Sequence, residues 1–178
     1  MLQLLTDHLA TPLGDFTLVA DEGGRLQAAE WTDCRDRLER SLRILHGADG
    51  YALKKARNPG GLSAALRAYF AGDIAAIDSL PVAKIGTAFQ HLMWRHLRKV
   101  KAGTTLSYGD FAKRIGKPAA MRAVGAANGA NPISIVVPCH RLVGANGALV
   151  KYGGGLRRKQ WLLEHEARVF RAASTVGA

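Results

Sequence analysis

Short apolar runs separated by turn residues occupy the first third of the chain. The runs cover residues 2–8, 16–20 and 25–31, and segments rich in glycine, proline and acidic residues separate them at 11–14 and 21–24. Runs of this length between such turns are typical of strands joined in hairpins. The pattern therefore predicts a small antiparallel meander.

A helical period follows the predicted sheet. Leucines spaced three and four positions apart between residues 38 and 45 come after Asp33, a residue type favoured at helix N-caps. A second helix is predicted over residues 63–71, because Asn58-Pro59-Gly60-Gly61 ahead of it is a loop sequence. Residues 77–83 have the composition of a linker.

Two capping patterns predict helices in the second half. Thr87 and Gln90 form a capping box, in which each residue can bond the backbone of the other. Ser107 and Asp110 form an acidic variant of the same box, and Gly116 is well suited to end the helix that they open.

The helix ending at Gly116 is the first half of a predicted helix-turn-helix. Pro118 opens a second helix that extends to about residue 128, consists mostly of alanine and glycine, and has Arg122 as its only charge. Small side chains with one arginine suit close approach to DNA without base reading, since base readers usually present several polar groups. The same residues would also let two helices pack closely, so both interpretations stay open for this stretch.

The most informative stretch runs from Ile133 to Arg141. Its apolar, β-branched residues up to Val137 predict a short buried strand that Pro138 ends. Cys139 and His140 follow directly, so the strand would deliver a thiol beside an imidazole, as a positioned nucleophile requires. Adjacent side chains diverge on a strand, and we expect His140 to reach Cys139 through a sharp turn or a bridging water. A purely structural buried cysteine is the alternative.

Charge is divided unevenly between the two halves of the 178 residues. Residues 1–83 hold 9 Lys and Arg against 11 Asp and Glu, a net charge of −2, whereas residues 84–178 hold 16 against 3, a net charge of +13. Such an excess predicts binding to a polyanion, and nucleic acid is favoured over a membrane because no basic amphipathic helix with a bulky apolar face suggests membrane binding. Two distant cysteines and the lack of a membrane-spanning run indicate a reducing compartment, the cytoplasm.

Pro138-Cys139-His140-Arg141 resembles the active-site signature of the O6-alkylguanine-DNA alkyltransferases. The resemblance covers nearly the whole chain and is closest to the bacterial Ogt-type enzymes, because Asn58-Pro59-Gly60-Gly61-Leu62 also matches. It implies an α+β fold: an N-terminal α/β, ribonuclease-H-like domain over 1–83, and a mostly helical C-terminal domain over 84–178. The second domain would hold a winged-helix-like helix-turn-helix and the cysteine on its strand and turn.

The resemblance also implies DNA repair by a single-use enzyme. The alkyl group of O6-alkylguanine, and of O4-alkylthymine, in double-stranded DNA would pass irreversibly to Cys139 after the base is flipped out. His140 would activate the thiol, oriented by a carboxylate. Asp110 is committed to capping, which leaves Glu164 and Glu166, and the resemblance selects Glu166.

The other residues that the resemblance assigns contact substrate or DNA. Arg122 would fill the gap left by the base, and Tyr108 would push on a phosphate and help neutralise the departing base. The full set comprises Tyr108, Arg122, Asn131, Arg141, Tyr152, Gly153, Gly154 and Lys159. Neither a cofactor nor a metal is expected, and the partner would be DNA bound by a monomer, with cooperative binding left open.

Two other classes of protein compete with this interpretation. A Cys-His hydrolase would explain the thiol but not the helix-turn-helix or the basic second half. A non-catalytic protein that binds alkylated lesions would not need Cys139. Val150 and Lys151 depart from the family pattern, which leaves the tolerance of bulky alkyl groups undecided.

Overall fold

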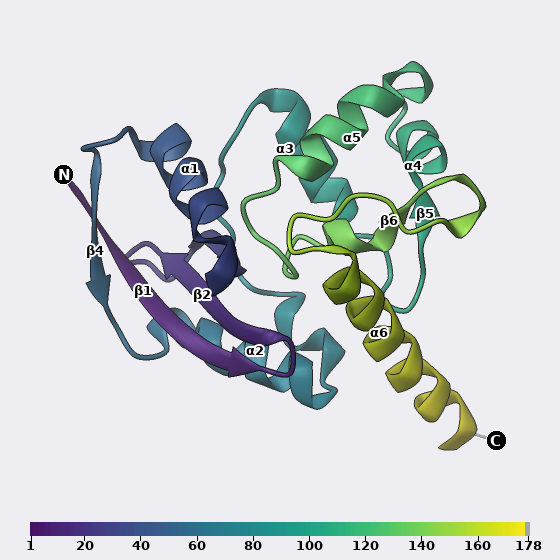
Figure 1. Ribbon diagram of the computed structural model, residues 1–178, viewed down its shortest axis with the longest axis horizontal. Helices are drawn as coiled ribbons and strands as arrows, with labels where there is room; N and C mark the ends of the chain where they lie inside the picture. Colours follow the sequence, from purple (N-terminus) through teal and green to yellow (C-terminus); the bar gives the residue numbers. More distant parts are fainter. Residues whose placement is uncertain (177–178) are drawn as a thin grey trace. The chain divides into compact units, whose positions relative to one another are not determined.

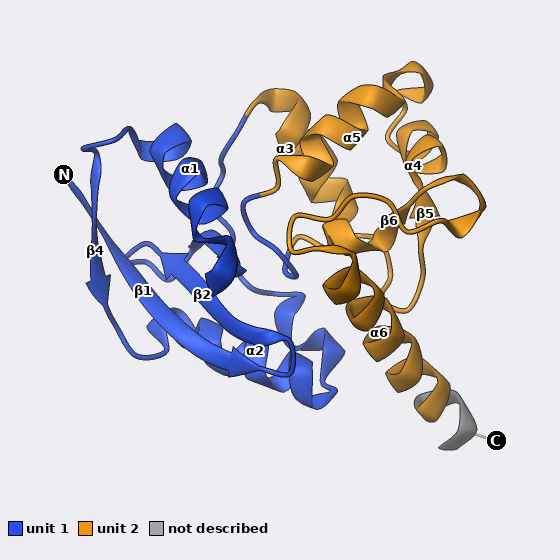
Figure 2. Ribbon diagram, viewed as in Figure 1, with its two compact units in different colours: residues 1–86, 132–136 blue, residues 87–131, 137–178 orange. Residues whose placement is uncertain are grey.

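The computed structural model describes residues 1–176, which form two compact units (Figure 1, Figure 2). The first unit contains Met1–Gly86 and also the short segment Pro132–Val136. The second contains Thr87–Asn131 and the described residues from Val137 onward. The chain thus passes from the second unit into the first and back just before Cys139, which the sequence pattern did not indicate.

A four-stranded sheet forms the centre of the first unit. Its strands are β1 (Leu2–Thr11), β2 (Gly14–Ala20), β3 (Leu26–Trp31) and β4 (Tyr51–Lys55), in the order β3-β2-β1-β4. The first three form the predicted antiparallel meander. The fourth was not predicted, and it pairs with β1 in the parallel direction.

Helices α1 (Arg35–His46) and α2 (Leu62–Ala71) complete this unit. Leu38 and Leu42 of α1 are buried in one cluster with apolar residues of the sheet, which is why the leucine period predicted the helix. The prediction that Asp33 is the N-cap of α1 is wrong, because Cys34 occupies that position. Asp33 lies in a 3-10 turn, Thr32–Cys34, that comes before the helix.

Three helices of the second unit are those that the two capping patterns and Pro118 predicted. Helix α3 (Ala88–Leu97) begins with the complete Thr87–Gln90 capping box, and the Ser107 side chain caps α4 (Tyr108–Arg114). A turn with Pro118 connects α4 to α5 (Met121–Gly129). These elements confirm the helix-turn-helix.

Two short strands and a long helix make up the rest of the unit. Strands β5 (Leu106–Ser107) and β6 (Leu142–Val143) pair in parallel, and α6 (Leu156–Val176) follows a loop that contains Gly153, Gly154 and Gly155. Together with the sheet of the first unit, they confirm the predicted α+β class.

The predicted strand before Cys139 is wrong. Ile133 makes a single parallel bridge to Ala29 of β3, after which the chain turns. Val136 N–H donates to Ser134 C=O at 2.9 Å around Ile135, whose φ is 72°. This is a γ-turn in its rare, strained positive-φ form. The apolar run correctly indicated burial, but burial does not distinguish a strand from a buried turn.

Candidate active site

Cys139 follows a second tight turn. Pro138 has φ −79° and ψ 64°, and Cys139 N–H donates to Val137 C=O at 2.8 Å, which is an inverse γ-turn. Asn131 holds the same Val137 carbonyl through its side-chain amide at 2.8 Å. Cys139 then begins a 3-10 turn with only 5% of its surface exposed, so the nucleophile candidate is a buried residue.

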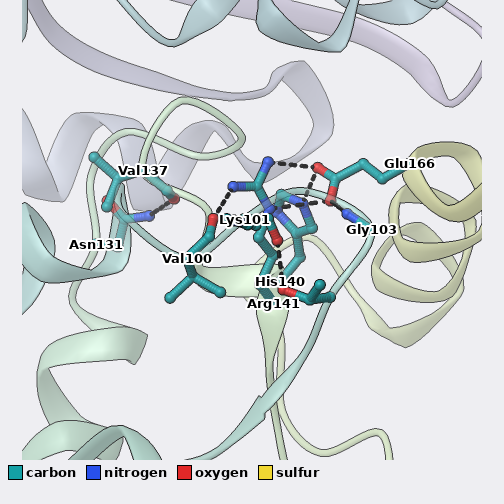
Figure 3. Close-up of polar contacts among 9 residues, drawn as sticks. Val100, Lys101, Gly103, Asn131, Val137, His140, Arg141 and Glu166 are labelled. Atoms are coloured by element: carbon teal, nitrogen blue, oxygen red, sulfur yellow. Dashed lines mark hydrogen bonds and ion pairs between the residues drawn. The ribbon is translucent and has the colours of Figure 1, made fainter. Parts of the chain in front are cut away.

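His140 pairs with Glu166 of α6 inside the unit (Figure 3). The distance from His140 Nε2 to Glu166 Oε1 is 2.9 Å, and both side chains are fully buried. Since a carboxylate only accepts hydrogen bonds, Nε2 carries the proton, and Nδ1 of the neutral ring is left as an acceptor. This Nδ1 is buried with no hydrogen-bond partner among the described residues. Glu164, the alternative carboxylate, is exposed and accepts a bond from Gln160.

Arg141 lies in the interior, where it also binds Glu166 (Figure 3). Its Nε and Nη2 donate to the two carboxylate oxygens at 3.0 and 2.9 Å, and its Nη1 donates to Val100 C=O at 2.6 Å. Gly103 N–H adds a fourth bond to the carboxylate at 3.2 Å. The guanidinium is therefore engaged inside the protein, although it was expected to contact substrate or DNA.

The charges of this cluster follow from burial and neighbours. Burial by itself would raise the pKa of Glu166, but His140 and Arg141 outweigh it and hold that pKa well below its ordinary value. Burial lowers the pKa of His140, and Arg141 and Lys159 add to the effect against the opposing influence of Glu166. The pair is thus a carboxylate and a neutral imidazole at neutral pH.

Lys159 lies seven residues before Glu166 on α6, which puts both side chains on the same face of the helix. Its Nζ donates to the carbonyls of Leu142 at 2.6 Å and Val150 at 2.8 Å. Burial lowers the pKa of Lys159 to about 8, and the proximity of Cys139 opposes this shift. The ammonium group thus ties α6 to the chain on both sides of the loop that follows Cys139.

Tyr108 and Asn128 contribute a second polar group beside Cys139. Asn128, near the end of α5, donates from Nδ2 to the Tyr108 hydroxyl at 3.2 Å and to the Cys139 carbonyl at 3.3 Å. Burial raises the pKa of Tyr108, so its hydroxyl keeps its proton at neutral pH. Sequence reasoning predicted Tyr108 but missed Asn128, because nothing local distinguishes a buried asparagine from a helix-ending one.

The other predicted residues range from exposed to buried. Arg122 is exposed on the first turn of α5. Tyr152 and Gly153 are partly buried in the loop before α6, and Gly154 is buried and accepts a bond from Arg158. Gly103 was not predicted, although its φ of 73° and its bond to Glu166 make it part of the cluster.

Within residues 1–176, no helix is both long and apolar enough to cross a membrane. The same part of the chain contains no cluster of three His, Cys, Asp or Glu side chains that could hold a metal ion.

A buried thiol next to a His–Glu pair, in the unit that carries a helix-turn-helix, defines a class of protein: a DNA-modifying enzyme with a cysteine nucleophile. Comparisons with known proteins agree. Residues 88–168 match the family described as the 6-O-methylguanine DNA methyltransferase DNA-binding domain. A methylated-DNA–protein-cysteine methyltransferase of Salmonella typhimurium is 54% identical over 93% of this chain and 97% of its own length. The chain belongs to the methylated-DNA–protein-cysteine methyltransferase family of DNA-repair enzymes.

Solved structures give the same result. The crystal structure of Mycobacterium tuberculosis OGT in complex with DNA matches with a TM-score of 0.73 and 36% identity, over 94% of each chain. The O6-methylguanine-DNA methyltransferase of Pyrococcus kodakaraensis matches with a TM-score of 0.63 and 26% identity, over 92% of this chain and 98% of its own. The protein is accordingly a DNA-binding methyltransferase that repairs DNA by methyl transfer to a cysteine.

Proposed function

We propose that Cys139 is the cysteine that accepts the alkyl group. The observation that carries this assignment is the buried His140–Glu166 pair with its unused Nδ1, on the residue directly after the thiol. Cys34, the other cysteine, is a partly exposed residue whose thiol bonds Asp33 at 3.6 Å. Only Cys139 is thus next to a buried base.

Cys139, His140 and Glu166 can carry out the transfer with every proton and bond accounted for. The thiol proton passes through one bridging water to His140 Nδ1, while Glu166 stabilises the imidazolium that forms. The thiolate then attacks the alkyl carbon, a sulfur–carbon bond forms, and the carbon–O6 bond breaks with its electron pair going to the base. The base finally takes up a proton, so the net change moves the thiol's proton to guanine. The product is a thioether that no neighbouring group can hydrolyse, so each molecule acts once.

The alkylated base must leave the duplex to reach this thiol. Extruding a base costs a few kcal/mol, least for a damaged one. We assign Arg122 to the gap that the base leaves, since it is exposed at the start of α5 and arginine insertion is a common minor-groove device. Tyr108 would act on the phosphate of the extruded nucleotide and supply a hydrogen-bond donor to the departing guanine. Tyr152 and the backbone of Gly153 and Gly154 would line the pocket for the base.

Three of the predicted residues are better assigned to building the site than to touching DNA. Asn131 secures the turn at Val137. Arg141 keeps Glu166 ionised and oriented, and Lys159 binds the carbonyls of Leu142 and Val150, on either side of the loop that follows Cys139. All three are buried, which supports roles inside the protein.

We further propose that residues 84–178 form the domain that binds DNA and transfers the alkyl group, and that residues 1–83 form the ribonuclease-H-like domain. The partner would be double-stranded DNA containing O6-alkylguanine or O4-alkylthymine, bound by a monomer in the cytoplasm. Cys34 and Cys139, both outside a disulfide, suit that reducing compartment.

Mass spectrometry tests the central assignment. After incubation with a duplex that contains O6-methylguanine, we expect one added methyl group on the peptide that contains Cys139. The Cys34→Ala variant should still accept the methyl group. Cys139→Ala should not, yet it should bind the duplex with an affinity that falls steeply as salt increases. Protein of unchanged mass beside an unrepaired lesion would refute the proposal.

A further inference from the structure

Asn128 joins three segments of the active-site unit at one amide nitrogen. It lies near the end of α5, it is 6% exposed, and its Nδ2 bonds both the first residue of α4 and the nucleophile's own backbone. The two amide hydrogens of Nδ2 are thus both used, one on the Tyr108 hydroxyl and one on the Cys139 carbonyl.

The Cys139 carbonyl determines which way the amide faces. A carbonyl oxygen can only accept, so the NH2 end of Asn128, and not its Oδ1, must point toward it. The same carbonyl also accepts the backbone N–H of Leu142, which closes the 3-10 turn. The orientation of Asn128 is therefore set by the backbone of the nucleophile.

This orientation has a consequence for Tyr108. Because the NH2 group of Asn128 can only donate, the Tyr108 oxygen must accept, and the single hydroxyl hydrogen is left to point elsewhere. Tyr108 is partly exposed, and no described residue accepts that hydrogen. An amide in the opposite orientation would instead attract the hydrogen toward the protein and away from a substrate.

We propose that Asn128 is a positioning residue that directs the Tyr108 hydroxyl hydrogen toward the departing guanine. Because Asn128 also binds the Cys139 backbone, it fixes this donor relative to the residue that carries the attacking sulfur. The inference rests on the proposed role of Tyr108 as hydrogen-bond donor to that base. As the carbon–O6 bond breaks, negative charge develops on guanine, and a donor already aimed at the base stabilises it without reorientation. Asn128 itself touches neither the base nor the alkyl carbon.

A double-mutant cycle on the single-turnover transfer rate, measured at saturating methylated duplex, tests the inference. We expect Asn128→Ala to slow the transfer by roughly tenfold, the effect of one neutral hydrogen bond that the transition state requires. In the Tyr108→Phe background, where no hydroxyl remains to be aimed, the same substitution should change the rate by less than about twofold. The affinity for unmethylated duplex should not change with Asn128→Ala.

Trp94→Phe is the matched control. Trp94 Nε1 donates to Ala127 C=O at 2.9 Å, so this variant also removes a buried hydrogen bond at the same end of α5, but one with no contact to Tyr108 or Cys139. Any effect of Trp94→Phe on the rate should be the same with and without the Tyr108 hydroxyl. Urea unfolding of each variant shows whether it is folded, and Asn128→Ser replaces Asn128→Ala if the latter is not.

The outcomes distinguish the positioning role of Asn128 from the donor role of Tyr108. If Asn128→Ala slows the transfer equally in both backgrounds, or leaves it at the original rate while Tyr108→Phe is slow, the positioning role is refuted and the role of Tyr108 stands. If Tyr108→Phe transfers at the original rate, the donor role of Tyr108 fails, and the inference fails with it. None of these outcomes contradicts the proposal that Cys139 accepts the methyl group, which mass spectrometry tests separately.

Discussion

Glu166→Gln removes one charge from the centre of the active site and leaves the shape of the side chain almost unchanged. The carboxylate accepts four hydrogen bonds, from His140 Nε2, from two nitrogens of Arg141 and from Gly103 N–H, at distances of 2.9 to 3.2 Å. A glutamine has one oxygen and one NH2 group, so at least one of these donors would face another donor. The buried guanidinium of Arg141 would also lose its counter-charge.

The expected cost is large compared with the stability of a domain. Breaking a buried ion pair by removing one partner costs about 3–5 kcal/mol, because the remaining charge stays buried. A folded domain is stable by about 5–15 kcal/mol in total, so the variant should be folded but much less stable. The transfer rate should also fall, because an amide NH2 group facing Nε2 would move the ring proton to Nδ1 and remove the base.

The dependence on pH gives a second signature. The pKa of Glu166 is lower in the folded protein than in the unfolded chain, so protonation favours unfolding, and this contribution to stability is present above the unfolded pKa and lost as pH falls. The original protein should therefore lose stability steadily below about pH 4.3, the ordinary pKa of a glutamate. Glu166→Gln should lack this part of the acid sensitivity.

Urea unfolding at pH 7 and at pH 4, together with single-turnover transfer, measures all three effects. Glu164→Gln is the control, since it makes the same chemical change two residues away on the same helix at an exposed position, and should alter stability by less than about 0.5 kcal/mol. If Glu166→Gln proves as stable as Glu164→Gln at pH 7, the buried ion pair does not stabilise the folded protein.

Three further predictions concern the same unit and the segment that precedes it. Burial lowers the pKa of His140 below its ordinary 6.5. The transfer rate, measured in stopped-flow assays, should therefore stay constant from pH 8 down to about 6.5 and decline only at more acid pH. A decline centred above pH 7 would contradict this. Ser134→Ala removes a buried hydrogen bond of 3.2 Å to a carboxylate on β3, and urea unfolding should show a loss of about 1–3 kcal/mol, whereas an unchanged midpoint would show that the contact is dispensable. Gly103→Ala places a methyl group 2.8 Å from a ring carbon of Phe170 at a φ of 73°, and should lower the free energy of unfolding by at least about 1 kcal/mol. Gly125→Ala on α5 meets open space and should stabilise the protein slightly, so equal unfolding midpoints for the two variants would contradict this prediction.

Local patterns were enough to predict the elements whose geometry depends on neighbours in the chain. The Thr87–Gln90 box, the Ser107 cap and the leucine period of α1 all act within four residues, and each predicted a helix that the structure contains. The meander was predicted for the same reason, since hairpins pair adjacent segments. Strand β4 was missed because it pairs in parallel with β1, some fifty residues away in the chain.

The segment just before Cys139 has a conformation that the local sequence pattern could not predict. Residues from Ile133 to Val137 are as apolar as a strand, yet they form a γ-turn at Ile135. A β-branched residue adopts a positive φ only where its surroundings compensate for the strain. Here the compensation comes from distant partners: the Ala29 backbone bonds Pro132 and Ser134, and Glu30 bonds the Ser134 side chain.

By itself the sequence determined the chemistry: a cysteine followed by histidine and arginine, a basic second half and a helix-turn-helix. Only the tertiary structure decided which group acts on which. It turned Arg141 inward to Glu166, paired that carboxylate rather than Glu164 with His140, and placed Asn128 between Tyr108 and the Cys139 backbone. Residue type fixes what a side chain can donate, accept or attack, but burial and the partner across the fold decide its charge and its direction, and both arise from contacts between segments far apart in the chain.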